Sequence, residues 1–577
     1  MSRASRGETV FMQQHNIRRT IHTLAQATAV LGIALATLAA GAQQQGHNEN
    51  AHFAPGNLVV SRSVYDNNAA NVKVGTILPP NCASTQGGCG ASTGAPANGI
   101  YPFVFNNVIY DASFGITSRI FLDQLTPEGR LIGSLEVPNS FDHGIKSTSD
   151  QLVTSFSSKS EIALHLSTDH RFLTFMGYVA PVNTIDVSNS NTPLAIDPTN
   201  PVGQEFLRGV AAVDHNGKFS FTETNAYSGN NGRAAILNNT DGEPFFYTAG
   251  NAGNGANPQP NGIVLGAGAQ FIDLTNKHEA QQDPGTPAPV SSFSVTLLGD
   301  KADKVGKDDN FRGMTVFNNV LYYTKGSGSN GVNTVYFVDT TGKACPNGVG
   351  LPAADAKLPT TPLAFDPAAL QTTGLPSNMC ILAGFPTALA KTANPVAFPF
   401  ALWFANATTL YVADEGDGFA SDSTLYTHAA AQTTAGLQKW VFNTSTSTWN
   451  LAYTLTNGLQ LGVPYTIHGY PTGTNAATNL PWAPATGGLR NIEGQVNRDG
   501  TVTVWAITST VSGGGDTGAD PNRLVAINDR LSNTDATVAA KEQFSIVRQA
   551  GFAEVLRGVA FAPGTGVDDD HGQGDNR

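Results

Sequence analysis

The sequence predicts an all-β protein, a β-propeller with seven blades of four antiparallel strands each, and three observations carry this prediction. The first is composition: 61 glycines and 32 prolines among 577 residues, with 13% charged residues, are typical of many short strands and tight turns rather than of long helices. The second is a series of segments in which apolar and polar residues alternate between turn residues. The third is a short motif that recurs along the chain.

The stretch 408–442 shows the expected blade unit most clearly. An alternating run at 410–413 ends on the acidic turn 414–418, and a second run at 436–442 returns after an insertion. Period-two alternation bounded by Gly and Asp is the pattern of paired strands. We interpret this stretch as the inner part of one blade, and most of the chain as variations on it.

The first half of the chain is expected to form consecutive hairpins. At 126–129 the residues Thr-Pro-Glu-Gly place Pro second and Gly fourth in a type I turn, which favours pairing of the runs on either side. The strands expected here are 57–62, 119–123, 130–138, a pair within 161–177, 218–222, 234–237 and 244–248.

The same pattern resumes after residue 310. The residues Asn-Arg-Asp-Gly at 497–500 form a further turn, and the segment 543–561 lies where a last strand can pair into the first blade and close a ring. The other strands expected in this half are 320–324, 334–339, 399–404, 410–413, 436–442, 489–494 and 501–507.

Four segments open with Leu or Phe, then Arg, usually Gly, and soon an apolar residue. The spacings are irregular, as expected of divergent blades with insertions. Arginines at matched places predict either an anion-binding rim of the central channel, through bidentate guanidinium contacts, or structural pairs with carboxylates between blades. The four arginines are Arg208, Arg312, Arg490 and Arg557.

A propeller explains these features because a small sheet cannot bury both of its faces alone, whereas sheets packed around an axis give each blade two apolar neighbours. Between six and eight candidate blades can be counted, and seven is the preferred number. The alternative is two β-sandwich domains joined near 281–292. Consecutive hairpins favour the propeller over this alternative.

The amino terminus predicts export. Arg18 and Arg19 precede the apolar run 24–40, and a small-x-small pattern at 40–42 marks a cleavage point, so 1–42 is expected to be a signal peptide of a secreted or periplasmic protein. An uncleaved anchor is the alternative, and the paired arginines leave twin-arginine export open.

The remainder of the chain divides into three expected parts. A polar, disordered segment covers 43–54, a single propeller domain with loop insertions covers 55–563, and a disordered acidic tail covers 564–577. No second stretch is long enough to cross a membrane once the leader is removed.

The formal net charge of −12, without a basic run in the body of the chain, argues against a nucleic-acid surface. The partner expected at the channel is therefore a small molecule or a protein. Export agrees with four cysteines: Cys82 with Cys89, and Cys345 with Cys380, is the simplest disulfide pairing, each closing a local loop, although other pairings stay open.

Two stretches resemble known propeller families. The residues LYVADEG at 410–416, with GLQKW at 436–440, resemble blades of secreted NHL- and YVTN-type propellers and, less closely, those of gluconolactonase-like and phytase-like hydrolases. The segment 489–507 is similar to the blade opening of an esterase-like phytase group, with Glu493-Gly494 in place of its Glu-Gly. The resemblance implies a propeller and, in the metal-dependent hydrolases, carboxylates of several blades that converge on an axial calcium ion.

The resemblance makes Glu161, Asp414, Glu415 and Glu493 candidate calcium ligands, since each lies near a strand end or a blade start. Asp414, Asp417 and Asp422 form a second candidate, a surface calcium loop, although the stretch lacks the register of an EF-hand. The alternative for all of them is that they cap turns or pair with the arginines. No residue is assigned a catalytic role.

The function expected from the sequence is therefore that of an exported propeller that binds a ligand or a protein or serves as a scaffold. The alternative is a calcium-dependent hydrolase of phosphate or carboxylate esters, in which a carboxylate polarises a metal-bound water. No nucleophile elbow, zinc-protease motif, Walker loop or dinucleotide fingerprint is present in the sequence. His143 and His468 are isolated histidines without an evident partner.

Overall fold

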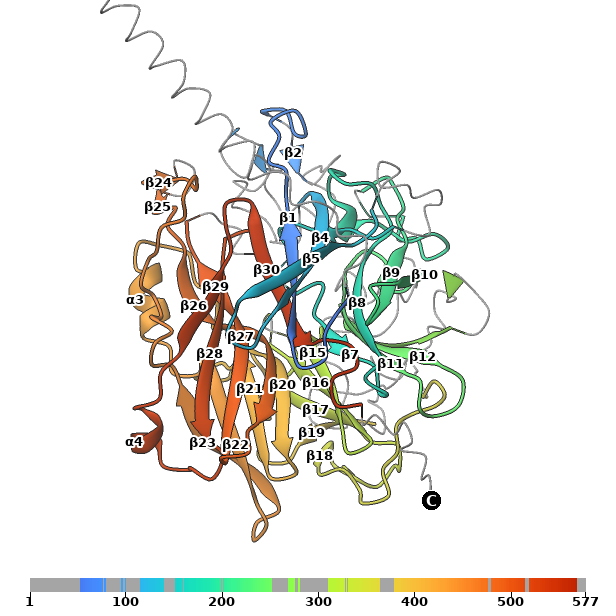
Figure 1. Ribbon diagram of the computed structural model, residues 1–577, viewed down its shortest axis with the longest axis vertical. Coiled ribbons are helices and arrows are strands. Elements are labelled where there is room, and N and C mark those ends of the chain that lie inside the picture. The colour runs from blue at the N-terminus through green and yellow to red at the C-terminus, as the bar shows by residue number, and fades with distance from the viewer. Residues whose placement is uncertain are drawn as a thin grey trace, which may run out of the picture. The chain divides into compact units, whose positions relative to one another are not determined.

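The computed structural model describes residues 52–567 apart from six longer stretches, 79–94, 100–114, 140–150, 252–267, 281–309 and 364–377, with a few described residues near position 95 and further gaps of one to four residues (Figure 1). The predicted signal peptide, most of the acidic tail, Cys82, Cys89 and His143 lie outside the described residues. No helix in the described part of the chain combines the length and the apolar character that a membrane span needs.

The described strands form six sheets of three to five strands, arranged as the blades of a β-propeller. The propeller prediction is confirmed, but the preferred number of seven blades is wrong. Residues near 60, 120, 135 and 557 all belong to one blade, so both ends of the chain build a single sheet, as expected for the closing segment. The prediction of four antiparallel strands in every blade is also wrong, because one described sheet has three strands and two sheets carry a short parallel strand.

The first three blades contain the N-terminal strands and the closing strand. In hydrogen-bonded order, blade 1 consists of β30 (Glu554–Phe561), β1 (Leu58–Val64), β4 (Thr117–Leu125) and β5 (Leu131–Glu136), with β6 (Thr154–Ser155) beside β4. Blade 2 consists of β7 (His165–Leu166), β8 (Phe172–Tyr178), β9 (Arg208–Asp214), β10 (Phe219–Thr224) and the parallel β14 (Glu279–Ala280). Blade 3 consists of β11 (Gly232–Asn238), β12 (Phe245–Gly250) and β13 (Ala269–Asp273).

The remaining blades follow in chain order. Blade 4 consists of β15 (Gly313–Phe317), β16 (Val320–Lys325), β17 (Thr334–Val338), β19 (Met379–Leu382) and the parallel β18 (Val349–Gly350). Blade 5 consists of β20 (Pro399–Asn406), β21 (Thr409–Asp414), β22 (Gly436–Asn443) and β23 (Thr448–Leu455). Blade 6 consists of β26 (Ala485–Val496), β27 (Thr501–Val511), β28 (Arg523–Arg530) and β29 (Ser545–Gln549).

A few short elements lie outside the blades. They are two small hairpins, β2 (Ile77–Leu78) with β3 (Ala95–Pro96) and β24 (Thr474–Asn475) with β25 (Leu480–Pro481), the helices α3 (Leu425–Ala430) and α4 (Ala536–Ala539), and the 3-10 turn η3 (Val187–Asn189).

The two ends of the described chain meet in blade 1. Strand β30, red in Figure 1, pairs antiparallel with the blue strand β1, from Leu58 opposite Phe561 to Val64 opposite Glu554. This pairing seals the ring, as the sequence predicts for 543–561, and it contradicts the alternative of two β-sandwich domains.

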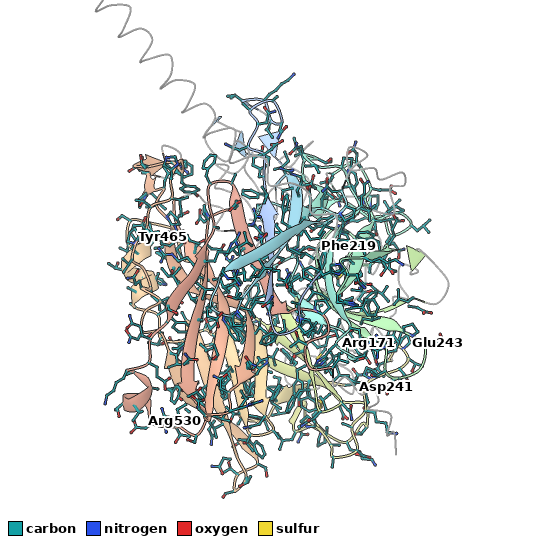
Figure 2. The ribbon with its side chains drawn as sticks, in the orientation of Figure 1. Arg171, Phe219, Asp241, Glu243, Tyr465 and Arg530 are labelled. Carbon is teal, nitrogen blue, oxygen red and sulfur yellow. A yellow bond between two sulfur atoms is a disulfide. The ribbon has the colours of Figure 1, made fainter. Side chains whose placement is uncertain are left out.

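The core lies between neighbouring blades rather than at one centre. Buried apolar clusters join blade 1 to 2, blade 2 to 3, blades 3, 4 and 5, blade 5 to 6, and blade 6 back to 1. Side chains accordingly fill the spaces between the ribbons in Figure 2. Aromatic stacking tightens one such interface, where the ring centroids of Phe317 and Phe404 lie 4.5 Å apart.

The connections differ in length at the two ends of the sheets. The innermost and second strands of blades 2 to 6 are joined by short turns, and Asn318 and Asn319 between β15 and β16 both have positive φ, 48° and 59°, as a two-residue type I′ hairpin requires. The connections from second to third strand, and from blade to blade, are mostly longer. The strands are antiparallel, so the short turns gather at one end of the channel and the long connections at the other.

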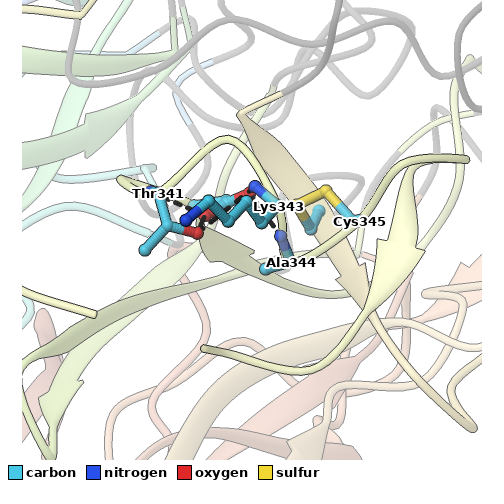
Figure 3. The surroundings of a disulfide bond; sticks show 6 residues. Thr341, Lys343, Ala344 and Cys345 are labelled. Atoms are coloured by element: carbon cyan, nitrogen blue, oxygen red, sulfur yellow. Dashed lines mark hydrogen bonds between the residues drawn. A yellow bond between two sulfur atoms is a disulfide. The ribbon is translucent and has the colours of Figure 1, made fainter. Parts of the chain in front are cut away.

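The predicted disulfide between Cys345 and Cys380 is confirmed, and it ties the loop after β17 to β19, the strand that lies between β17 and the edge strand β18 (Figure 3). Beside it the Asp339 carboxylate accepts hydrogen bonds from the backbone N–H groups of Thr341 and Ala344, both at 2.8 Å. A disulfide of this kind is consistent with the predicted extracytoplasmic location.

Candidate functional site

A buried segment, 154–164, of which residue 159 lies outside the described residues, lies among the innermost strands and is the centre of a polar network. Its Glu161 is fully buried: one carboxylate oxygen accepts hydrogen bonds from the Thr154 hydroxyl at 2.7 Å and the Ser155 backbone N–H at 3.0 Å, and the other accepts from the Tyr178 hydroxyl. Burial and the Glu161 charge raise the pKa of Tyr178 well above its usual value. Glu161, a predicted calcium ligand, is thus held by protein groups.

Three of the four predicted rim arginines lie at the inner ends of blades, and all four are buried. The guanidinium of Arg312 donates to the Ser160 hydroxyl at 3.0 Å, and that of Arg557 donates to the Phe156 carbonyl. Both contacts attach innermost strands of the ring to segment 154–164.

Arg490 forms an ion pair between two blades, as the alternative of a structural role predicts. Its Nε, on strand β26, lies 3.2 Å from the carboxylate of Glu415, which follows β21. Arg208 instead donates to backbone carbonyls, including those of Ser190 at 2.8 Å and Phe206 at 2.6 Å. Burial lowers the pKa of Arg208 to about 10. Binding of an anion by these arginines stays a prediction.

A fifth buried arginine, Arg233 at the start of β11, was not predicted. Its guanidinium donates to the Asn310 side chain and to the Phe311 carbonyl, which joins blade 3 to blade 4. The residue follows a Gly and precedes two alanines, so it lacks the Leu/Phe-Arg-Gly pattern. The apolar run that follows it, at the same distance as in the other blades, is the signal that could have revealed it.

The predicted carboxylates fall in separate places. Asp414 is buried, accepts backbone N–H groups of Phe398 at 2.8 Å and Gly416 at 3.0 Å, and has a pKa that burial raises to about 7. Asp417 is exposed and contacts the His428 imidazole at 2.7 Å. Asp422, also exposed, accepts from Thr424 at the start of α3, which lowers the pKa of Asp422.

Among the described residues, the one group of three or more His, Cys, Asp or Glu side chains with ligand atoms within 4.8 Å of one another is Asp339 with Cys345 and Cys380. Those two cysteines are joined in a disulfide and do not offer thiolates. The structure therefore does not bring the six predicted carboxylates into one cluster, and calcium binding stays a prediction.

A cavity of about 630 Å³ opens at the axis, at the end of the ring where the short hairpin turns gather. Residues of all six blades line it, and most of them belong to innermost strands. Its mouth includes the exposed residues Thr240, Asn318 and Asn319, and its deeper part includes His165, Asn491 and Glu493. A concave site of this volume with a few convergent polar groups is the usual form of a small-molecule site.

Two titratable groups in this cavity have shifted pKa values. Burial raises the pKa of Glu493 to about 7, although the backbone N–H groups of Gly494 and Phe561 oppose the shift. Burial lowers the pKa of His165 to about 4, so its imidazole is neutral at neutral pH. The Nδ1 atom of His165 is buried and lacks a hydrogen-bond partner among the described residues.

Glu493 was predicted as a metal ligand, and it is the one predicted site residue that lines this cavity. His165 was missed because, as one of many scattered histidines within an expected strand, it carried no sequence signal. Of the two histidines that the sequence singled out, His468 is exposed on the surface and His143 lies outside the described residues.

Comparison with known proteins does not identify the chain. No protein-family profile and no curated protein matches its sequence. Solved structures with a similar arrangement include a PL25 ulvan lyase, with 10% identity and a TM-score of 0.29 over 77% of this chain and 90% of the other. The Synechocystis apocarotenoid oxygenase has 10% identity and a TM-score of 0.26 over 77% of this chain and 72% of the other. The Xanthomonas campestris GH74 xyloglucanase has 10% identity and a TM-score of 0.25 over 74% of this chain and 52% of the other. Similarities of this size carry no argument about chemistry.

Proposed function

We propose that the protein is an exported propeller that binds a small molecule in its axial cavity. The observation that carries this proposal is the cavity itself, in which the His165 imidazole and the Glu493 carboxyl face a space of about 630 Å³ with their pKa values displaced by burial. Displaced pKa values in a cleft are enriched at functional sites. Export rests on the predicted leader and agrees with the Cys345–Cys380 disulfide.

A second candidate function is hydrolysis of a bound ester or glycoside. The observation in its favour is that burial raises the pKa of Glu493 to about 7, so this carboxyl is protonated in a substantial share of molecules at neutral pH and can donate the proton to a leaving group, as a general acid does. His165 lines the same cavity as a neutral imidazole, and its lowered pKa makes it a weak base there. The calcium-dependent form of this chemistry stays a prediction, and chelation of the purified protein tests it through the melting temperature and ester hydrolysis.

The binding proposal predicts that ligand binding is lost when a bulky side chain obstructs the mouth of the cavity. Thr240 lies at the mouth and is exposed, so Thr240→Trp is expected to fold and to obstruct entry. We expect compounds that raise the melting temperature of the wild-type protein, in a thermal-shift screen of sugars, amino acids and organic acids, to lose their effect on this variant.

The matched control is Glu128→Gln, an exposed substitution in the turn between β4 and β5, which should keep every stabilising effect. Compounds that stabilise Thr240→Trp as strongly as the wild type would show that binding occurs elsewhere. To separate binding from hydrolysis, Glu493→Gln should abolish turnover of any cleaved compound while leaving its binding measurable.

A further inference from the structure

The charged groups around the axis are distributed unevenly. None of the described residues that line the cavity is a lysine or an arginine. Of the arginines near the axis, Arg490 is paired with Glu415, and Arg312 and Arg557 hold segment 154–164. An anion that enters the cavity would therefore lose hydration without meeting an ammonium or guanidinium group, which is costly.

The cavity also offers little electrostatic stabilisation to a cationic ligand. Glu493 is the one acidic residue among the described lining residues, and burial raises its pKa to about 7. Near neutral pH this carboxyl is protonated for much of the time. A cationic ligand would thus meet one incompletely ionised partner, while His165 adds no charge.

Apart from Glu493 and the imidazoles of His165 and His170, the polar residues of the lining are serines, threonines and asparagines, which carry no charge and can donate as well as accept hydrogen bonds. Thr315, Asn319 and Asn491 contribute hydroxyl and amide groups to the lining, together with the serine and threonine hydroxyls at 167 and 168. Hydroxyl groups of a ligand match such a set, because each of them also donates and accepts.

Apolar side chains make up the rest of the wall. Leu402, Phe317 and Trp403 are among them, and the indole of Trp403 is fixed from one side by the backbone of Gly494, where an added Cβ would lie 2.6 Å from the ring. A rigid aromatic group beside polar groups suits a ligand with both C–H surfaces and hydroxyl groups.

We infer that the axial cavity takes an uncharged molecule that carries several hydroxyl groups, such as a neutral sugar. This inference deepens the proposed function and rests on it. It excludes two classes of ligand that the proposal by itself leaves open, organic anions and organic cations.

The test compares three probes of nearly equal size: cellobiose, the corresponding disaccharide with a uronic acid, and the one with an amino sugar. Binding to the full-length secreted protein is measured by isothermal titration calorimetry at pH 7, and on Thr240→Trp as the blocked form. We expect the wild-type protein to bind cellobiose at least about tenfold more tightly than either charged probe. We expect the Thr240→Trp variant not to bind cellobiose.

Replacement of the carboxyl sharpens the comparison. At pH 8, where Glu493 is ionised, Glu493→Gln removes a negative charge from the cavity, so the affinity for the uronic acid probe should rise toward that for cellobiose. The exposed change Glu128→Gln should leave all three affinities unaltered.

The outcomes separate the inference from the function that it rests on. If a charged probe binds as tightly as cellobiose or more tightly, and Thr240→Trp abolishes that binding, the ligand class is wrong and the cavity remains the binding site. If cellobiose does not bind, the inference is likewise overturned. If binding of any probe persists on Thr240→Trp, the proposed function itself fails.

Discussion

Gly558 shows how a single residue fixes the centre of the ring. It lies in β30, and a Cβ at this position would meet the Leu164 backbone nitrogen at 2.6 Å and the Ile162 carbonyl oxygen at 2.7 Å. Its own N–H donates to the Ser61 hydroxyl, which in turn donates to the Ile162 carbonyl, both at 2.7 Å. The closing strand therefore approaches segment 154–164 at the distance that only a glycine permits.

Replacement Gly558→Ala is expected to lower the free energy of unfolding by about 1–3 kcal/mol, because the backbone of 162–164 has to move to accommodate a methyl group. Denaturant unfolding measures the difference. Gly133→Ala, in β5 of the same blade, is the control, since nothing lies within 4 Å of a Cβ there. Equal effects of the two substitutions would contradict the close packing of β30.

Blades 5 and 6 are joined by a buried ion pair. Lys439 in β22 and Asp529 in β28 are both fully buried, with 2.8 Å between the Lys439 Nζ and the carboxylate, and the Tyr453 hydroxyl donates to Asp529 at 2.7 Å. Glu542, which follows α4, lies against this group. Burial, and a hydrogen bond and charge repulsion from Asp529, raise the pKa of Glu542 to about 7.

This arrangement predicts a decline in stability as the pH rises. The pKa of Glu542 is higher in the folded chain than the ordinary value of 4.5. The contribution of this carboxyl to the free energy of unfolding is therefore fully present below pH 4.5 and is lost as the pH approaches and passes 7. In Glu542→Gln the melting temperature should fall less between pH 5 and pH 8 than in the wild type.

The comparison of slopes isolates Glu542 from Glu493 and Asp414, whose pKa values are raised in the same range and which both proteins keep. The exposed substitution Glu128→Gln is expected to reproduce the wild-type slope. A slope for Glu542→Gln that equals the wild-type slope would show that the carboxyl ionises without cost to the folded protein.

The whole molecule depends on closure, because each sheet needs two neighbours to cover its apolar faces. Clusters on both sides of blade 1 include residues of β30, such as Ala560 on one side and Phe561 on the other. Without this strand, blades 6 and 2 would each expose a face.

Truncation after Gly551, which removes β30, should therefore abolish cooperative thermal unfolding and the sharp tryptophan emission change that accompanies it. Truncation after Val567 is the control, since it keeps β30 and is expected to leave the melting temperature nearly unchanged. A cooperative transition in the shorter chain would refute the role of β30 in closing the ring.

Part of the site followed from local patterns, and part did not. Arg490 and Glu493 were singled out because a short motif opens a blade, and the structure places both near the axis. Their surroundings were not predictable, since Glu415, which pairs with Arg490, and His165, which lines the same cavity as Glu493, come from other blades. The blade number was not predictable because long connections occur both within a blade, as at 179–207 between β8 and β9, and between blades, as at 383–398 between β19 and β20, and a local pattern does not tell the two apart.

The sequence by itself determined that short strands alternate with turns, and it favoured small sheets that shield one another around an axis and a disulfide between Cys345 and Cys380, because periodicity, turn residues and cysteine spacing are local properties. Only the tertiary structure decided that six blades close the ring and that His165 and Glu493 share one cavity. Residues more than 300 positions apart become neighbours through packing of the blades, and the burial that displaces their pKa values exists only once the ring is closed.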